Sequence, residues 1–388
     1  MPSASTFEIV ERATAVAALA NEYSDAGEEQ RQLHPVVIDA IADAGFFSML
    51  VPRELGGLEV DVVTMSNVIA AVARGDGAAG WCVMIAATTG VTAAQLPREG
   101  AAEMFSDSRA ATGGVLMPRG RATRVDGGWR VSGQWSFGSG SGHAKWLLGG
   151  SLVFGPDGPE TTPENVPHAR MMFFPREDVQ ILDTWYVSGL RATGSNDFEV
   201  KDVFVPERRS CPIGGGERWN KGTLYAFPIY GLLAIGVASV GLGIGQAAID
   251  TLRELASAKT PTGSRRLLAE RGAAQSGIAE AEALVRAGRA FMHEAIRSAW
   301  DRVTQGGKLT LDDRALLRLA STTAAMNAAK AVDLCYNLGG ASSIYQNSPL
   351  QRHFRDIHTV TQHVMVGQPT LEVAGRIFLG LPTDTSMF

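Results

Sequence analysis

A β-rich block at residues 109–215 lies between two blocks of helical periodicity, and this order limits the fold more than any other feature of the chain. Within the block, short runs of β-branched and aromatic residues alternate with glycine and proline clusters, at intervals typical of a small antiparallel barrel or sandwich. Outside it, apolar residues recur at helical spacing. We therefore predict a mainly α protein with a central β domain: an N-terminal helical domain at 1–108, a β-barrel at 109–215 and a C-terminal four-helix bundle at 216–388.

The same patterns predict individual elements. N-terminal helices are expected around Val36–Ile41, Asp61–Ala73 and Gly80–Thr89. Strands are expected at Arg130–Trp135, Trp146–Phe154, Arg170–Phe174 and Phe198–Val205. Long alanine-rich helices are expected at Gly231–Ala258, Leu267–Gln305, Leu311–Leu338 and Leu350–Val366, with a short one opened by Pro369. The tripeptide Asp126-Gly127-Gly128 between two β-prone runs predicts a hairpin turn.

One segment is long and apolar enough to suggest a membrane span. Residues Ile229 to Ile249 carry no formal charge, and about 20 such residues cross a bilayer. The segment holds five glycines, however, and lacks aromatic and basic belts on both sides. We therefore expect a buried helix of a soluble bundle that packs closely through its glycines.

Charge and cysteine content exclude several classes of protein. The formal net charge is -5 and its signs are interspersed, so no basic block indicates nucleic acid or a membrane surface as a partner. The cysteines Cys82, Cys211 and Cys335 are scattered and lack metal-ligand spacing, which fits a reducing cytoplasm and predicts no metal. Early charged residues, among them Glu8, argue against a signal peptide.

The stretch Gly133–His143 holds the residues best suited to bind a flat ligand. Trp135 and Phe137 leave a strand at period two, so we expect them on one face, and glycines then alternate with serines. Glycine lets the backbone approach a ring, the aromatic side chains supply walls, and Ser139 supplies a hydroxyl. This set suits a planar redox ring. The alternative is a strand that runs into a flexible loop with two core aromatics.

Several stretches together resemble the acyl-CoA dehydrogenase superfamily, over nearly the whole chain. They are Leu50–Gly57, Gly189–Ser195 running into Val200–Pro206, and the helical bundle. Within that superfamily the chain is more similar to the oxygenase components of two-component flavin-dependent monooxygenases (group D hydroxylases). Trp135–Gly140 with the following His143-Ala144, and the last long helix Pro349–His363, carry this closer resemblance.

The resemblance implies an enzyme that takes reduced FMN or FAD by diffusion from a separate flavin reductase. Dioxygen adds to the flavin to form a C4a-hydroperoxyflavin, which hydroxylates a small aromatic or polycyclic substrate. By the same resemblance Ser139 hydrogen-bonds flavin N5, and Trp135 and Phe137 border the ring. The resemblance also implies a homotetramer.

The choice between oxygenase and dehydrogenase depends on a catalytic base. Acyl-CoA dehydrogenation requires a positioned carboxylate with a tuned pKa. Counting from Arg355-Asp356, Val364 stands where the dehydrogenase glutamate would fall, and no Asp or Glu lies between Glu217 and Asp250. The sequence therefore favours an oxygenase. A dehydrogenase with an unusual base, an oxygenase that hydroxylates an amine nitrogen, and a non-catalytic flavin-binding protein stay open.

A neutral imidazole can accept a phenol proton, and histidine suits this because its reference pKa is about 6.5. His363 is our first candidate for this base and His358 our second. On one helix, residues five apart point about 140° away from each other, so both cannot face one ligand. Trp81, in a buried helix, is expected in the substrate pocket beside His363.

Further flavin contacts follow from the resemblance. Met117 and Pro118 fall where the superfamily runs its backbone along the flavin pyrimidine. Three residues after the first bundle helix are candidates for the flavin phosphate: Lys259, Thr260 and Ser264. Gly339 and Gly340 resemble the paired glycines that, in dehydrogenases, contact the nucleotide of a neighbouring subunit's FAD. The alternative for Lys259, Thr260 and Ser264 is a solvated loop, and the alternative for the two glycines is a helix stop.

Overall fold

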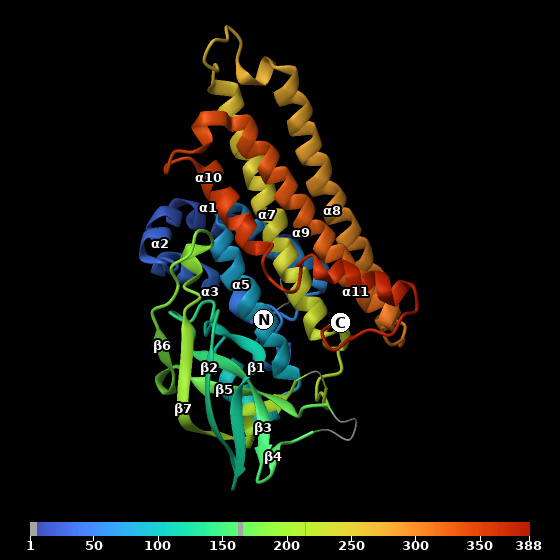
Figure 1. Ribbon diagram of the computed structural model, residues 1–388. Coiled ribbons are helices and arrows are strands. Elements are labelled where there is room, and N and C mark those ends of the chain that lie inside the picture. The colour runs from blue at the N-terminus through green and yellow to red at the C-terminus, as the bar shows by residue number, and fades with distance from the viewer. Residues whose placement is uncertain (1–5, 162–165, 214) are drawn as a thin grey trace.

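The computed structural model describes residues 6–161, 166–213 and 215–388. Helices come first, a β-sheet follows, and long helices complete the chain, so the predicted acyl-CoA dehydrogenase-like order of elements is confirmed. The sheet lies at one end of the molecule and the long helices at the other, with the N-terminal helices beside their junction (Figure 1). The predicted domain boundaries at 108/109 and 215/216 fall in segments that connect the three regions.

Helix caps fix two of the N-terminal helices. Asp61 accepts hydrogen bonds from the amides of Val63 and Thr64, and Asp76 accepts one from the amide of Ala79. The six helices of this region are α1 (Thr6–Glu22), α2 (Ser24–Gln30), α3 (Pro35–Asp43), α4 (Val62–Gly75), α5 (Gly77–Gly90) and α6 (Arg98–Phe105).

The β domain is one eight-stranded sheet with the order β6-β7-β2-β1-β3-β5-β8, and β4 pairs with β3. Its strands are β1 (Thr112–Val125), β2 (Gly128–Trp135), β3 (Trp146–Gly155), β4 (Gly158–Pro159), β5 (Ala169–Pro175), β6 (Gln180–Leu182), β7 (Asp197–Pro206) and β8 (Ser210–Pro212). All pairs are antiparallel except β1 with β3. Within the described part of the chain no pair joins β6 to β8, so the domain predicted as a small β-barrel is a central β-sheet with two edges.

Strand β1 ends in a tight turn and carries a bulge near its middle. Asp126 and Gly127 form the turn to β2, as predicted, with Gly127 at φ 73°. The register of β1 against β3 shifts between Val115 and Gly120, so the intervening residues bulge out of the ladder. A Cβ at Gly150, on β3 beneath the bulge, would overlap the carbonyl of Leu116. The glycine therefore lets the bulged strand cross β3 closely.

The C-terminal helices are α7 (Ile229–Ala258), α8 (Gly272–Thr304), α9 (Leu311–Gly339), α10 (Pro349–Val360) and α11 (Pro369–Phe378). Two helical segments have the length and hydropathy of a membrane span, Gly77–Ala94 and Ile229–Ala258, but 89% of each apolar window is buried inside the chain. A Cβ at Gly243 would overlap the Ala70 carbonyl, so α7 and α4 pack backbone to backbone. This is the packing expected for the glycine-rich segment.

The last long helix ends earlier than predicted. It stops at Val360 rather than Val366, and His363 lies in the turn that follows. The angle of about 140° expected between His358 and His363 therefore does not apply, because only His358 is on the helix.

Candidate active site

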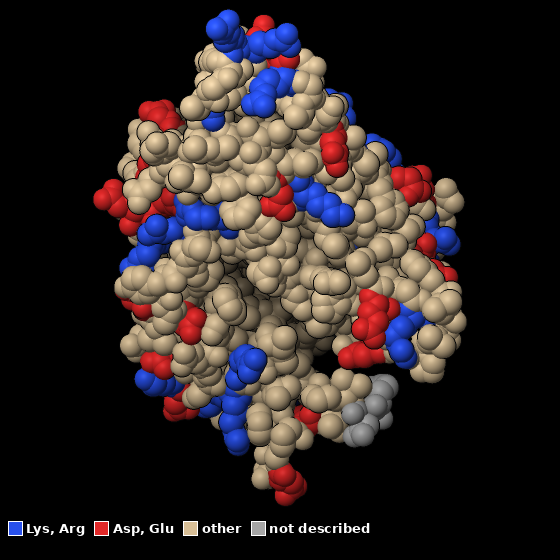
Figure 2. Space-filling view, turned by 45° about the horizontal axis from the view of Figure 1, so that its top comes forward, with Lys and Arg blue, Asp and Glu red and all other residues tan. Residues whose placement is uncertain are grey.

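A cavity of about 930 Å³ lies where the sheet meets the helices. Its walls come from α5, the β1 bulge, the loop after β2, the start of α7, the turn after α10 and residues Ser386 and Met387 near the end of the chain. Acidic and basic side chains in Figure 2 lie mostly toward the edges of the face shown, and its hollowed centre is mostly uncharged. The cavity wall is itself mainly apolar.

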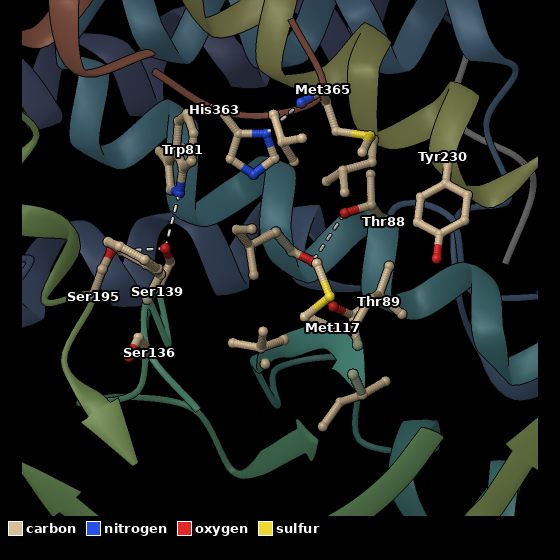
Figure 3. Close-up of a pocket in the computed structure, with 18 of the residues that line it drawn as sticks. Trp81, Thr88, Thr89, Met117, Ser136, Ser139, Ser195, Tyr230, His363 and Met365 are labelled. Atoms are coloured by element: carbon tan, nitrogen blue, oxygen red, sulfur yellow. Dashed lines mark hydrogen bonds between the residues drawn. The ribbon is translucent and has the colours of Figure 1, made fainter. Parts of the chain in front are cut away.

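The loop after β2 presents the Ser139 hydroxyl to this cavity. The amide of Gly138 donates to Asn196 O and the amide of Gly140 donates to Thr193 O, so this loop is tied to the one before β7. A Cβ at Gly138 would lie 2.7 Å from the Phe198 ring, so the close approach requires glycine. Ser139 Oγ accepts a hydrogen bond from Trp81 Nε1 at 3.0 Å (Figure 3).

Phe137 and Trp135 separate instead of sharing a face. Phe137 has a φ of 70°, is largely exposed and lines the cavity. Trp135 is fully buried, stacks on Phe198 with centroids 5.1 Å apart, and donates to Gly150 O at 2.8 Å. The expectation that Trp135 borders the flavin is corrected: its indole belongs to the core of the sheet. The left-handed backbone at Phe137 ends the strand alternation on which the prediction depended.

The structure brings His363 and Trp81, the two residues predicted for the substrate pocket, together at the cavity. Their rings meet edge to face with centroids 5.5 Å apart. His363 Nδ1 accepts from the amide of Met365 at 3.3 Å, and the other ring nitrogen points into the cavity (Figure 3). Burial lowers the pKa of His363 to about 4. The neutral ring therefore carries its proton on Nε2.

His358 lies outside the cavity. Its Nε2 is 2.8 Å from Asp333 Oδ1 on α9, and its ring packs against Phe354. His358 was the second candidate base, and the structure instead makes it a partly exposed residue whose ring contacts Asp333 between α10 and α9.

The described part of the cavity wall carries no carboxylate. Among the described residues that line it there is no Asp or Glu, and Val364 occupies the predicted position of the dehydrogenase base. The acidic residue of α10, Asp356, is buried and accepts from the amide of Leu190 at 2.6 Å. The described lining therefore offers an imidazole and hydroxyl groups, and no carboxylate base for removing a proton next to a thioester.

The remaining predicted flavin contacts divide into two groups. Met117 and Pro118 line the cavity, because the β1 bulge carries them there. Lys259, by contrast, follows the far end of α7, where its Nζ donates to Gly339 O at 2.7 Å and Gly340 lies beside it. Thr260 and Ser264 belong to the same far loop. This second group is absent from the cavity wall of its own chain.

The residues present fit a flavin. The cavity offers the Phe137 ring as a wall, the backbone of the bulge along one edge and the Ser139 oxygen as a buried polar atom. Arg119, at the end of the bulge, is the one charged side chain on the described lining and can pair with a phosphate. These residues would hold the ring and its side chain at this place.

Several lining groups were not found from the sequence. Thr193 and Ser195 form a hydroxyl chain with Ser139, and Tyr230 brings a phenol from the start of α7 (Figure 3). Thr193 and Ser195 lie in the turn Gly189–Ser195, which carries part of the family resemblance, so the sequence held a signal for them. Nothing local marked Tyr230, because only the packing of α7 against the other helices, α5 among them, brings it here.

Metal and disulfide chemistry have no candidate groups in the described ranges. There, no three His, Cys, Asp or Glu residues lie close enough to hold a metal ion. Cys82, Cys211 and Cys335 are buried as free thiols.

Comparison with known proteins gives the family. Residues 8–105 match the acyl-CoA dehydrogenase N-terminal domain and residues 235–368 match the acyl-CoA dehydrogenase C-terminal domain. Indole-3-acetate monooxygenase of Pseudomonas putida is 35% identical and the match covers 91% of this chain and 89% of that protein. The oxygenase component of the FADH(2)-dependent resorcinol hydroxylase of Rhizobium sp. is 26% identical, covering 96% and 94%.

Solved structures agree. The 3-HSA hydroxylase from Rhodococcus sp. RHA1 has a TM-score of 0.90 at 25% identity, with 98% of this chain and 99% of that chain covered. XiaF from Streptomyces sp., in complex with FADH2 and glycerol, has a TM-score of 0.89 at 26% identity, with 97% and 96% covered.

Fold and site together define a flavin enzyme of the acyl-CoA dehydrogenase fold without the dehydrogenase base. The chain belongs to the flavin-dependent monooxygenases of this fold, the group that holds the oxygenase components of two-component hydroxylases.

Proposed function

We propose that the protein hydroxylates a small aromatic or polycyclic substrate with dioxygen, using reduced FMN or FAD supplied by diffusion from a separate reductase. The observation that carries this proposal is a buried serine hydroxyl, Ser139, in a mainly apolar cavity with no Asp or Glu among its described lining residues. The relatives support the substrate class, since indole-3-acetate and resorcinol are aromatic. A separate reductase is supported by the resorcinol hydroxylase relative, which is an oxygenase component.

When bound, reduced flavin supplies the electrons that activate dioxygen. The chain contributes three things. The apolar wall excludes water, which protects a reactive oxygen species from side reactions. Ser139 offers a hydrogen bond to the ring. His363 offers its Nε2 proton to an oxygen of the substrate, and it can take up a substrate proton only after its own proton moves to Nδ1 and the Met365 contact opens.

The test compares wild type with Ser139→Ala under a limited supply of reduced flavin. Wild type should bind reduced flavin under anaerobic conditions and, with oxygen and an aromatic substrate, form hydroxylated product. Ser139→Ala should release about ten times more hydrogen peroxide per product formed, because one hydrogen bond to the ring is lost.

Ser141→Ala is the matched control. Ser141 lies in the same loop, is fully buried, and its hydroxyl donates to Gly194 O rather than facing the cavity. Reduction of bound flavin by an acyl thioester without oxygen, or equal peroxide release from Ser139→Ala and wild type, would contradict the proposed function.

A further inference from the structure

Ser139 belongs to a chain of hydroxyl groups that runs along one wall of the cavity. Its Oγ lies 2.7 Å from Ser195 Oγ, which lies 2.7 Å from Thr193 Oγ1. Thr193 Oγ1 in turn lies 2.8 Å from the carbonyl oxygen of Leu190. All three hydroxyl residues are buried. At the opposite end from Leu190, the Trp81 indole contacts Ser139 at 3.0 Å.

The two ends of this chain fix the direction of every hydrogen bond in it. The indole N–H of Trp81 can only donate, and the carbonyl of Leu190 can only accept. Thr193 must therefore donate to Leu190, Ser195 to Thr193 and Ser139 to Ser195 if every contact is to be made. Ser139 thus donates its proton inside the protein and accepts the Trp81 proton with one lone pair. Its second lone pair is left for a ligand in the cavity.

The Leu190 end of the chain is anchored to α10. The Leu190 amide donates to Asp356 Oδ1 at 2.6 Å, and Arg355 Nη1 donates to Ser188 O. A Cβ at Gly189 would overlap the Arg355 carbonyl, so the turn lies directly on the helix backbone. Leu190 has a φ of 50°, which a branched residue adopts only when its surroundings impose it. The helix therefore holds in place the carbonyl that orients the hydroxyl groups.

We propose that Ser195 and Thr193 are positioning residues that hold the Ser139 hydroxyl as a hydrogen-bond acceptor toward the flavin. The inference rests on the proposed function, and it states in which direction Ser139 hydrogen-bonds the flavin. Reduced flavin carries a proton on N5, whereas oxidised flavin has only a lone pair there. A hydroxyl oxygen fixed as an acceptor can bind the N5 proton of reduced flavin, whereas it repels the N5 lone pair of oxidised flavin. The hydroxyl chain therefore makes the site prefer reduced over oxidised flavin.

Anaerobic titration with reduced FMN and aerobic titration with oxidised FMN test the inference, without substrate and without turnover. The measured quantity is the ratio of the two dissociation constants, oxidised over reduced. Ser195→Ala and Thr193→Val let the Ser139 hydroxyl rotate and donate to oxidised flavin. We expect each to lower the ratio by about three- to tenfold relative to wild type, the effect of one hydrogen bond. Thr193→Ser keeps a hydroxyl and should restore the ratio.

Ser141→Ala again serves as control, since its hydroxyl lies in the same loop but outside the chain. Its ratio should equal that of wild type. An unchanged ratio in both Ser195→Ala and Thr193→Val, or an equal fall in Ser141→Ala, overturns the inference. If wild type binds FMN and FAD in neither redox state, the proposed function itself fails, and that outcome is distinct from an unchanged ratio.

Discussion

His363 keeps an uncharged ring across neutral pH. Burial is the main cause and nearby Arg318 adds to it, and together they lower its pKa to about 4. The neutral form of a histidine is present above its pKa, so no ionisation of His363 falls near neutrality. We expect kcat/KM to be level from about pH 5.5 to 8 and to fall only as the pH approaches 4.

A pH profile of wild type and His363→Gln checks this expectation. The variant should lose activity by about 100-fold at every pH, as removal of a general acid or base does. An acidic limb near pH 6.5 in wild type that disappears in the variant would show that His363 titrates normally.

Phe137 combines backbone strain with a ring wall. Its φ of 70° disfavours any side chain with a Cβ, whereas glycine adopts it freely. We expect the free energy of unfolding of Phe137→Gly to exceed that of Phe137→Ala by about 1 kcal/mol, measured by denaturant unfolding. Both variants lose the ring, but only glycine relieves the strain. Both variants should bind reduced flavin several-fold more weakly. Equal stability of the two would show that the backbone is unstrained.

Residue-level prediction succeeded where the signal was local and failed where partners were distant. The glycines around Ser139 indicated a loop that approaches a ligand. Trp135 was misplaced because the alternation of a strand stops at an unusual φ that no sequence pattern revealed. His358 was misplaced because its partner, Asp333, lies on another helix.

At the level of elements, the helices and strands follow periodicity closely, since periodicity reports which face is buried. The first bundle helix was predicted from Gly231 and begins at Ile229, and both end at Ala258. The early end of α10 and the bulge in β1 were not predicted. Both depend on contacts across the fold, and both place residues of the cavity.

A buried pair of carboxyl groups lies where α5, α10 and the Leu190 turn meet. Burial, followed by repulsion from Asp356, raises the pKa of Asp76 to about 7. Burial likewise raises that of Asp356 to about 6, with Glu28 adding to it and Arg355 and Arg352 opposing it. Both groups hold protons more tightly in the folded than in the unfolded state. Their contribution to stability is therefore complete below about pH 4 and is lost as the pH rises through 7.

Asp76→Asn tests this linkage, because asparagine keeps the oxygen that caps α5. The variant should gain up to about 4 kcal/mol over wild type at pH 8 and almost nothing at pH 4. Urea unfolding at several pH values measures the difference. A variant equally destabilised at both pH values would show that the carboxylate itself is needed.

The segment that carries Ser386 and Met387 closes one side of the cavity. Phe388 anchors it: the ring is buried, the Arg318 guanidinium lies 4.7 Å from its centroid, and Arg314 Nη1 donates to Phe388 O at 3.2 Å. We expect Phe388→Ala to raise KM for the substrate about tenfold with little change in kcat, because apolar burial that holds the wall is lost. Phe388→Leu should restore KM. A fall in kcat alone would contradict this role.

For the whole molecule, the cavity is a product of assembly. Trp81, Met117, Ser139, Tyr230 and His363 come from five different elements, and the sheet and the helices must dock before they face one another. The order of the three regions was predictable because each has its own local texture. The full set of cavity residues was not, apart from those that a family resemblance supplied.

Lys259, at the far end of α7, lies far from the cavity of its own chain. Lys259 lies at the opposite end of a helix of 30 residues from Tyr230, a length of about 45 Å. It cannot reach the cavity of its own chain. Ile344 and Tyr345, which follow Gly340 in the chain, are exposed, which suits an interface. We predict that the protein is a homotetramer in which Lys259 approaches the flavin of a neighbouring copy.

Complementation distinguishes a neighbour's contribution from a structural one. Lys259→Glu and Ser139→Ala should each bind reduced flavin about tenfold more weakly when expressed alone, by loss of one charged or one neutral hydrogen bond. Co-expressed, they should assemble some sites that combine an intact Ser139 from one chain with an intact Lys259 from the next. Because those sites are complete, a fraction of the flavin should bind with wild-type affinity. If the co-expressed variants give only weak sites, Lys259 lies outside the site. The same holds if Lys259→Glu is a monomer in light scattering and still binds flavin as tightly as wild type.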